Sequence, residues 1–393
     1  MAESMRDLKD LLMSPDGVAF LASNDIFIDP EDFIARLEPP VQSGLIETTG
    51  AERQKPIYAL QQIYVDCTQS MLDRIMLLDR FAPHPECYPF FLWIDTDLSG
   101  TDALMHRFYW PLFSKKVSVR LSASVHDSRE LRFIPIETAR VQQALEKLNV
   151  YLGQSITGRK KVTRSKARAK YEQLKAVFLQ QTDGMLSEFN HRILYFLLNQ
   201  QSGLNPTSMI VSNLLDRDVI TGEINAYLNH LDAAIGVFND AVDALRAEGI
   251  DPKVKSLAAD YLPLHFSCLD CRRRLRLHRE VQGNDQFATA HCKCDHQYRF
   301  HLGRHELSID EIAQAGPWSP DVSLTLFIND FVSGYIGGGS SGIYYGLVMK
   351  AVLENVLHKR RVPILLPQAT SAEGNDPAYV DSLLYRYLLD QTG

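Results

Sequence analysis

The sequence predicts an α/β protein: a Rossmann-like parallel sheet core with a helical hairpin insertion and a small zinc-ribbon-like insertion. Three observations predict this class. Tyr88–Asp97 is a short, aromatic apolar run that ends in acids, residues 331–368 read strand, glycine turn, helix and strand, and four of the six cysteines lie within Cys268–Cys294. With 393 residues, 45% of them hydrophobic and 23% charged, the chain can bury a sizeable core and divide into domains.

Residues 1–150 are expected to form the first part of the core. Short helices and loops are predicted up to residue 55, and a largely helical segment over Ile57–Phe81, where apolar residues recur three and four apart. Tyr88–Asp97 is predicted to be a central strand, because parallel strands are buried on both faces and read as continuous apolar runs.

Residues 151–255 are expected to form the helical hairpin. Helices are predicted over Arg164–Asn199 and Gly222–Glu248. The second has apolar residues in steps of four and three, the spacing of a heptad seam. This seam comprises Ile224, Leu228, Leu231, Ile235, Phe238, Val242 and Leu245. It predicts packing within the hairpin, or across a homodimer.

Residues 256–305 are expected to form a zinc-ribbon-like module. Cys268-x2-Cys271 and Cys292-x-Cys294 nearly match the paired spacing of tetrahedral zinc ligands, and the intervening residues predict two strands around a Gly-Asn turn. Because the second pair has one intervening residue, His291, His296 or His301 is an alternative ligand. Four protein ligands predict a structural zinc ion. Unmetallated core cysteines, or a disulfide, are the alternative.

Residues 306–393 are expected to complete the core. Gly337, Gly338, Gly339, Ser340, Ser341 and Gly342 form a glycine-rich turn between a strand and a helix, with a second strand at 361–368. Such a turn lets backbone N–H groups approach a phosphate or carboxylate. The acid that follows the next strand in nicotinamide sites is missing, so we expect another anion. A turn needed only for close helix packing is the alternative.

Acids follow the first predicted core strand. Asp95, Asp97 and Asp102 could position Mg²⁺ or a substrate amine, because α/β proteins bind ligands at the carboxyl ends of their strands. Asp95 and Asp97 are the candidate catalytic residues. As capping residues after a strand they need no catalytic role.

Charge is distributed unevenly. The net charge is −7, yet residues 159–175 carry eight basic residues and a single acid, Glu172. A second basic cluster comprises Arg272, Arg273, Arg274, Arg276 and Arg279. Either could contact nucleic-acid phosphates, although nucleic-acid-binding proteins are usually basic overall and solvated faces are the simpler interpretation.

No membrane span or secretory signal is expected, because the sequence contains no long apolar run and begins MAESMRDLKDLL. The expected location is cytoplasmic, where thiols stay reduced and clustered cysteines favour a metal.

Several segments resemble the bacillithiol-biosynthesis cysteine-adding enzyme family. Ser319, Pro320, Asp321, Val322, Asp330, Gly337, Gly338, Ile343 and Tyr344 or Tyr345 match its S-P-N-V, acid and G-G-P-G-E-I-A-Y segments in order. Gln61, Gln62, Pro89, Trp93, Asp95 and Asp97 match its G-Q-Q segment and following strand. The resemblance covers about a third of the chain.

This resemblance implies a Rossmann-like core related to class I aminoacyl-tRNA synthetases. It also implies an ATP-dependent ligase, forming a carbon–nitrogen bond between an activated amino acid, with cysteine as one candidate, and the amine of a small molecule. Gln61, Gln62, Asp330 and the glycine turn would then bind ATP and Mg²⁺. The family's G-L-F-G-G-P, the histidine of its E-D-H-D and its C-terminal coiled coil are missing here. A divergent relative with another substrate, or one that has lost catalysis, fits these departures. The alternative function is a nucleic-acid-binding or assembly protein that uses the cysteine ribbon and the basic helix.

Overall fold

The computed structural model describes most of the chain. It covers residues 6–41, 55–98, 103–113, 115–122, 128–180, 182–321, 324, 327, 330–367 and 382–389. Asp102, Val322 and Gln368 lie outside the described residues.

A six-stranded parallel sheet forms the centre of the fold, so the α/β class is confirmed. Its strand order is β1-β13-β12-β2-β3-β6. The bounds are β1 (Ile26–Phe27), β2 (Lys55–Gln62), β3 (Cys87–Ile94), β6 (Ser208–Ile210), β12 (Gly334–Ile336) and β13 (Ile364–Leu365). The predicted strands at Tyr88–Asp97 and 361–368 correspond to β3 and β13, and β12, α13 (Gly339–Asn355) and β13 form the predicted βαβ unit.

The helix predicted over Ile57–Phe81 is wrong in its first part. Residues up to Gln62 belong to strand β2, and helix α4 (Gln69–Phe81) occupies only the second part. Ile57, Tyr58 and Ala59 are consecutive and all buried. A strand buried on both faces carries no alternation, and periodicity alone does not separate it from a buried helix.

The chain forms two compact units. Unit 1 comprises Met1–Leu60, Leu77–Leu92 and Ser212–Gln368, and unit 2 comprises Gln61–Met76, Trp93–Val211 and Ala369–Gly393. Residues 151–211 of the expected hairpin insertion therefore fall in unit 2, and residues 212–255 fall in unit 1.

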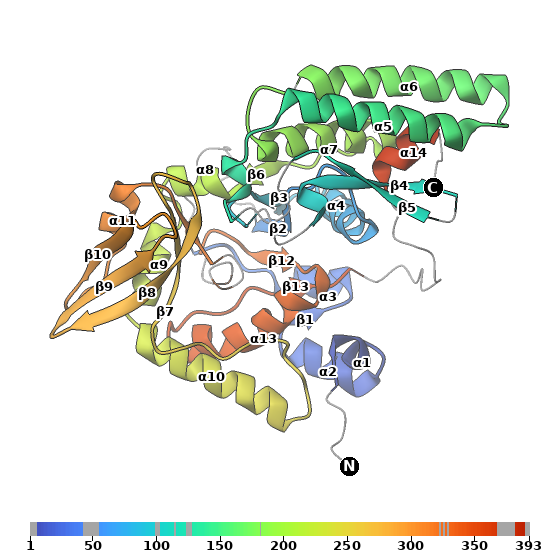
Figure 1. Cartoon of the computed structure of the whole chain (residues 1–393). Helices are drawn as coiled ribbons and strands as arrows, with labels where there is room; N and C mark the ends of the chain where they lie inside the picture. The colour runs from blue at the N-terminus through green and yellow to red at the C-terminus, as the bar shows by residue number, and fades with distance from the viewer. Residues whose placement is uncertain are drawn as a thin grey trace, which may run out of the picture. The chain divides into compact units, whose positions relative to one another are not determined.

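The helices of unit 1 are short except for two. α10 (Leu231–Ala247) and α13 have 17 residues each and pack against one another (Figure 1). The shorter helices are α1 (Leu8–Leu12), α2 (Pro15–Ser23), α3 (Pro30–Arg36), α9 (Thr221–Leu228) and α11 (Asp310–Ala315). α8 (Val211–Asp216) begins at the boundary of the two units.

The single helix predicted over Gly222–Glu248 is divided into α9 and α10 by Asn229 and His230. Leu228 and Leu231 are nevertheless buried on either side of the break, as the seam required. The side chain of Asn229 bonds to both backbone groups of Leu307, which fixes the chain at this point. The seam of α10 packs against α13 of the same unit, whereas α7 (Leu186–Ser202) belongs to unit 2.

Unit 1 also contains a five-stranded sheet with order β10-β9-β8-β7-β11. Its strands are β7 (Tyr261–Ser267), β8 (Arg274–Gln282), β9 (Asp285–His291), β10 (Gln297–Gly303) and β11 (Trp318–Pro320), all antiparallel to their neighbours. The predicted Gly-Asn turn joins β8 and β9. The sheet is larger than the two-stranded ribbon expected, because β10, the apolar β7 and the distant β11 extend it.

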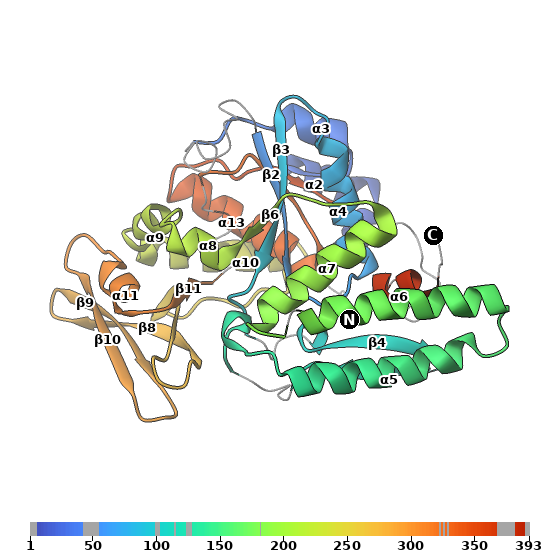
Figure 2. The same ribbon diagram turned by 90° about the horizontal axis from the view of Figure 1, so that it is seen from above.

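Unit 2 contains a helical hairpin whose two helices lie side by side in both views (Figures 1 and 2). Its helices are α5 (Thr138–Ile156) and α6 (Lys161–Gln180). The unit also contains α7, α14 (Leu383–Leu389) and a two-stranded sheet of β4 (Arg107–Leu112) and β5 (Lys115–Arg120). The helix predicted over Arg164–Asn199 is interrupted between α6 and α7, where Gly184 adopts a positive φ of 146°. Within the described ranges, every helix is too short or too polar to cross a membrane.

Candidate metal centre and sheet-edge site

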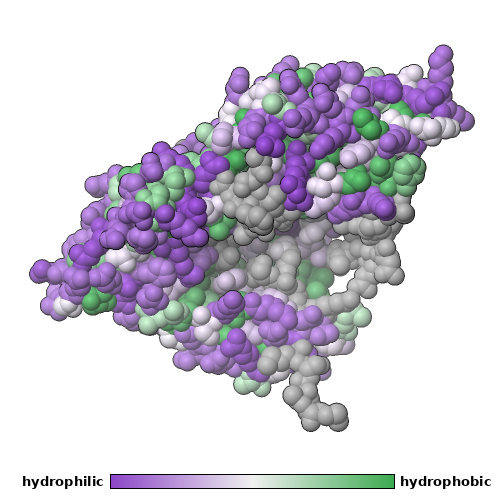
Figure 3. All heavy atoms as spheres, in the orientation of Figure 1, coloured by the Kyte–Doolittle hydropathy of each residue, from purple (hydrophilic) through white to green (hydrophobic). Residues whose placement is uncertain are grey.

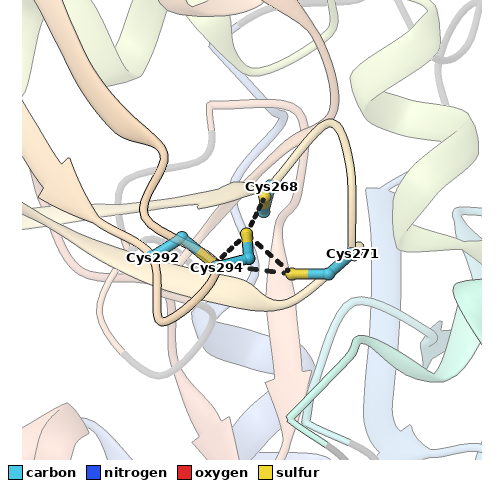
Figure 4. Close-up of side chains that lie close together, drawn as sticks. All are labelled: Cys268, Cys271, Cys292 and Cys294. Carbon is cyan, nitrogen blue, oxygen red and sulfur yellow. Dashed lines mark hydrogen bonds between the residues drawn. The ribbon is translucent and has the colours of Figure 1, made fainter.

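The four clustered cysteines come from two turns at one end of the five-stranded sheet. Cys268 and Cys271 lie in the turn between β7 and β8, and Cys292 and Cys294 lie in the turn between β9 and β10. Because β8 pairs with both β7 and β9, the two turns meet, and all four sulfurs point toward a common centre (Figure 4).

Both turns have a similar backbone form. In the first, the N–H of Arg272 donates to the carbonyl of Cys268 at 2.9 Å, and in the second the N–H of Asp295 donates to the carbonyl of Cys292 at 3.0 Å. Arg272 and Asp295 each follow the second cysteine of a pair and adopt positive φ values of 57° and 67°. A non-glycine residue in the left-handed region costs energy, so the two turns hold the cysteines in a defined geometry at some cost.

The sulfur positions fit a tetrahedral metal ion. Four Sγ–Sγ distances are 3.2, 3.4, 3.5 and 3.6 Å. Zinc–sulfur bonds of about 2.3 Å in a tetrahedron require sulfurs about 3.8 Å apart, whereas a disulfide requires about 2.05 Å. All four cysteines are free thiols, and their sulfurs lie within 4.8 Å of one another, so the cluster could hold a metal ion and is compatible with zinc.

The histidine alternatives lie outside this set of four. His296 Nδ1 is 3.4 Å from Cys294 Sγ, and these two residues form a second potential group with Asp270. His301 contacts Asp285 at 3.0 Å, and His291 is exposed. The cysteines therefore need no histidine to complete four ligands, although the second pair has only one intervening residue.

The electrostatics of the cluster favour a bound cation. Although burial raises it, hydrogen bonds from the Tyr298 hydroxyl, from backbone N–H groups and from Cys294 lower the pKa of Cys268 to about 6. The hydrogen bond with Cys292, together with burial, raises the pKa of Cys294 to about 12. Once one thiol has lost its proton, repulsion between negative charges keeps the neighbouring thiols protonated. A bound metal cation removes this repulsion. Tyr298, whose hydroxyl donates to Cys268 Sγ at 3.2 Å, was not predicted from the sequence. In the sequence, only the alternation of residue types along β10 indicated that Tyr298 faces inward.

The glycine-rich turn lies at the carboxyl ends of the parallel strands, next to the point where the strand order reverses. β2 and β12 are neighbours in the sheet. The chain leads from β2 to β3 on one side of this pair, and from β12 to β13 on the other. Ligands of doubly wound sheets bind at the carboxyl ends of the strands at such a reversal. The carboxyl end of β12 continues directly into the glycine-rich turn.

The glycine-rich turn combines packing with a helix start. A Cβ on Gly337 would lie 3.1 Å from Ile364 Cγ2 and 3.2 Å from Leu366 Cδ2, so packing against β13 accounts for this glycine. Gly338 is the extended N-cap and has no side chain to cap the helix. Gly339, Ser340, Ser341 and Gly342 form the first turn of α13. This turn carries no acid, so its partial positive charge is not offset by a side chain of the helix.

Within unit 2, a chain of hydrogen bonds joins the two glutamines at the end of β2 to an acid after β3. Arg74 Nη2 donates to Gln61 Oε1 at 2.6 Å, and Gln61 Nε2 donates to Gln62 Oε1 at 2.7 Å. Gln62 Nε2 then donates to Asp97 Oδ2 at 3.1 Å. Asp95 is buried at the end of β3, with 3% of its surface exposed. The structure thus brings together Gln61, Gln62 and Asp97. Arg74 was not predicted, and no feature of α4 distinguishes it.

Asp330 lies at the opposite end of β12 from the glycine-rich turn. It precedes the strand by four residues, and its Oδ2 contacts Lys359 Nζ at 2.5 Å. It lines a cavity of about 290 Å³ together with Lys359, Arg360 and Arg361, all of which precede β13. The structure does not bring Asp330 together with Gly337–Gly342.

No protein-family model matches the chain, and comparison with curated proteins gave no significant relative.

Proposed function

We propose that the chain is an ATP-dependent ligase that joins an activated amino acid carboxylate to the amine of a small molecule. The observation that carries this proposal is the position of the glycine-rich turn. It follows β12 at the reversal of a parallel sheet and opens a helix of 17 residues. This combination of bare backbone, helix N-terminus and sheet edge suits the phosphates of a nucleotide.

In the proposed reaction, the carboxylate attacks the α-phosphorus of ATP, which forms an acyl adenylate and releases pyrophosphate. The amine then attacks the acyl carbon, forms the C–N bond, loses a proton and releases AMP. Backbone N–H groups of Gly339–Gly342, in unit 1, bind the phosphates. Asp95 and Asp97, in unit 2, are the proposed ligands of a cation, and Gln62 donates a hydrogen bond to Asp97. The resemblance to the bacillithiol cysteine-adding enzymes supports this assignment and suggests cysteine as one candidate amino acid.

Calorimetry with ATP, ADP and AMP, with and without Mg²⁺, tests this proposal. Gly339→Val is expected to abolish binding, because its side chain would occupy the position of the anion. Gly222→Val is the matched control: Gly222 also lies in the first turn of a helix, and a Cβ there meets no atom within 4 Å. Binding of none of the nucleotides, or binding that Gly339→Val leaves unchanged, would refute the proposal.

We further propose that the cysteine cluster binds a structural Zn²⁺ ion. Four thiolates close the coordination sphere, so no position remains for a substrate or a catalytic water. The ion would stabilise a zinc-ribbon-like turn pair in a reducing, cytoplasmic environment.

A nucleic-acid-binding role is the second candidate, and a groove in unit 2 favours it. Lys161, Arg164 and Arg168 line a groove of about 340 Å³ between the end of α5 and the start of α6. No acid is among the described residues that line it. The surface over α6 is mainly hydrophilic in Figure 3. Arg164 and Arg168 lie one turn apart and could contact successive phosphates.

The salt dependence of RNA and DNA binding tests this role. Replacing Arg164 and Arg168 by Glu should weaken binding and reduce the slope of log K against log salt by about 2. Lys175→Glu is the control, since Lys175 is on the same helix but pairs with Glu172 at 3.9 Å and does not line the groove. Equal affinity of the parent and the double variant would exclude this interface.

A further inference from the structure

A cavity of about 290 Å³ lies within unit 1 at the amino ends of the neighbouring strands β12 and β13. We call it the arginine cavity. Its walls are formed by the end of α3 and the residues that follow it, by one residue of α13, and by the segments that precede β12 and β13. The described side chains that line it include four basic groups and two acids, which gives a net charge of +2; they are Arg36, Lys359, Arg360 and Arg361, and Glu38 and Asp330.

Arg361 carries a positive charge into the interior of unit 1 without a carboxylate partner. It is 0% exposed, and its Nη2 donates to the backbone carbonyl of Asn24. Its Nε and Nη1 have no hydrogen-bond partner among the described residues. Burial lowers the pKa of Arg361 to about 10, although the charges of Asp25 and Glu354 oppose this effect. The guanidinium therefore stays protonated at neutral pH, and a buried charge without a counter-ion is costly.

The two acids that line the arginine cavity are already paired with other residues. Asp330 Oδ2 lies 2.5 Å from Lys359 Nζ, and Glu38 forms an ion pair with Arg360. Neither acid therefore serves as the counter-ion of Arg361, which is left with the unpaired positive charge of the cavity.

A second buried polar group of the arginine cavity also lacks a partner. Ser333 immediately precedes β12 and is 3% exposed, and its Oγ has no hydrogen-bond partner among the described residues. Its backbone N–H donates to the carbonyl of Pro56 at 2.8 Å, so the position of the residue is fixed while the hydroxyl is available. Buried polar groups without partners are rare in proteins. Two of them in the walls of one cavity indicate that a ligand with a polar, negatively charged group binds there.

The rest of the lining of the arginine cavity is mainly apolar. It includes Phe327, Val332, Leu353, Val362 and Pro363. At about 30 Å³ for each water-sized group, the cavity has room for about ten non-hydrogen atoms. A ligand that matches this lining has a small apolar body and one charged end.

We propose that the arginine cavity binds a small carboxylic acid with an apolar body. The carboxylate accepts hydrogen bonds from Arg361 and Ser333, and the body packs against Phe327, Leu353 and Val362. A carboxylate fits better than a phosphate, because one negative charge balances one unpaired guanidinium and a second charge would be buried without a partner. Such a ligand is bound whether or not the chain is a ligase, because the glycine-rich turn lies at the other end of β12.

Calorimetry at neutral pH without nucleotide tests the proposal with two acids and their neutral amides. Phenylacetate and hexanoate carry the charge and an apolar body, phenylacetamide and hexanamide have the same bodies without the charge, and acetate has the charge without the body. Each acid should bind roughly 10-fold or more tightly than its amide, because hydrogen bonds between charged groups are the stronger ones. Acetate should bind roughly 10-fold or more weakly than hexanoate, because it buries fewer CH₂ groups. Binding of neither acid, or equal binding of the acids and their amides, would overturn the proposal.

Two variants locate the carboxylate within the arginine cavity. Arg361→Met removes the charge and keeps an apolar stem, and Ser333→Ala removes the hydroxyl. Each should weaken the binding of phenylacetate roughly 10-fold or more. Ser333→Ala keeps the backbone hydrogen bond to Pro56, so it decides the test if Arg361→Met does not fold.

Arg246→Met is the matched control for the arginine. Arg246 also donates to a backbone carbonyl, that of Val254, but it pairs with Asp243 at 3.1 Å and lies outside the arginine cavity. This variant should bind phenylacetate like the parent. If Arg361→Met and Ser333→Ala also bind like the parent, the arginine cavity is not the site.

Discussion

Removing one cysteine of the cluster should unfold the two turns that carry it while leaving the parallel sheet intact. Cys271→Ser is the most informative change, because Cys271 is only partly buried and its hydroxyl replacement fits the same space. We expect the parent protein to contain one zinc ion per chain and the variant to lose it. Cys87→Ser is the matched control, since Cys87 is a cysteine outside the cluster.

The size of the expected loss in stability follows from how few buried apolar side chains belong to the cysteine cluster. Its buried members are Cys268, Leu275 and Cys292, so Leu275 is the single ordinary apolar side chain among them. Burying one leucine contributes about 2 kcal/mol. Ordering the two turns, residues 268–273 and 292–296, costs at least about 1 kcal/mol per residue, or roughly 11 kcal/mol. A bound zinc ion, worth roughly 10–16 kcal/mol in comparable small sites, would offset this cost.

Elemental analysis and hydrogen exchange measured by mass spectrometry check the prediction. In Cys271→Ser, peptides that span 261–303 should lose protection by orders of magnitude, whereas peptides from β2 and β3 should exchange as in the parent. The reasoning fails if the parent protein contains no zinc or iron and its four thiols react freely in the native state. It also fails if the variant retains full protection in the turns.

Three further outcomes are expected. Leu231→Asp should lower the free energy of unfolding by several kcal/mol, because Leu231 is 2% exposed and a charge there has no partner; a variant that melts like the parent would show that the seam is not buried. Asp295→Val should destabilise the second cysteine turn by about 1–2 kcal/mol and weaken its affinity for a metal ion, because φ at this position is 67°. Asp295→Gly should have neither effect, and equal effects of the two variants in urea melts would contradict this. Burial, with a smaller effect from Arg192, lowers the pKa of His191 to about 4. The unfolded chain therefore takes up this proton first, and about 2 kcal/mol of stability is lost as pH falls from 6.5 to 4. The melting temperature of His191→Gln should fall less steeply over this range than that of the parent.

Elements whose signal is local were predicted correctly from the sequence. The apolar run at Tyr88–Asp97 became β3, and the Gly-Asn turn joins β8 to β9. The spacing of Cys268, Cys271, Cys292 and Cys294 predicted their convergence, because two tight turns on neighbouring hairpins need no distant contact to meet. The hydrogen bond from Gln62 to Asp97 was not predicted, because Gln62 was placed in a helix and lies instead at the end of β2.

Elements decided by distant packing were predicted less well. β2 read as a helix, because Ile57, Tyr58 and Ala59 are buried on both faces between β12 and β3 and show no alternation. The helix over Gly222–Glu248 is interrupted where Asn229 bonds to Leu307, a residue 78 positions away. Asp330 matched a family motif by order alone, yet it lies before β12 and the glycine-rich turn lies after it.

The sequence by itself determined the α/β class, the cysteine cluster and the glycine-rich turn, because each depends on residue types at short, fixed spacings. The tertiary structure alone decided where the sheet reverses and which residues gather around the arginine cavity. Arg36 and Leu353 come from α3 and α13, Ser333 and Arg361 precede β12 and β13, and no local pattern connects them. Burial of the apolar faces of these elements brings the residues together, and that free energy depends on the whole packed unit and not on any single segment.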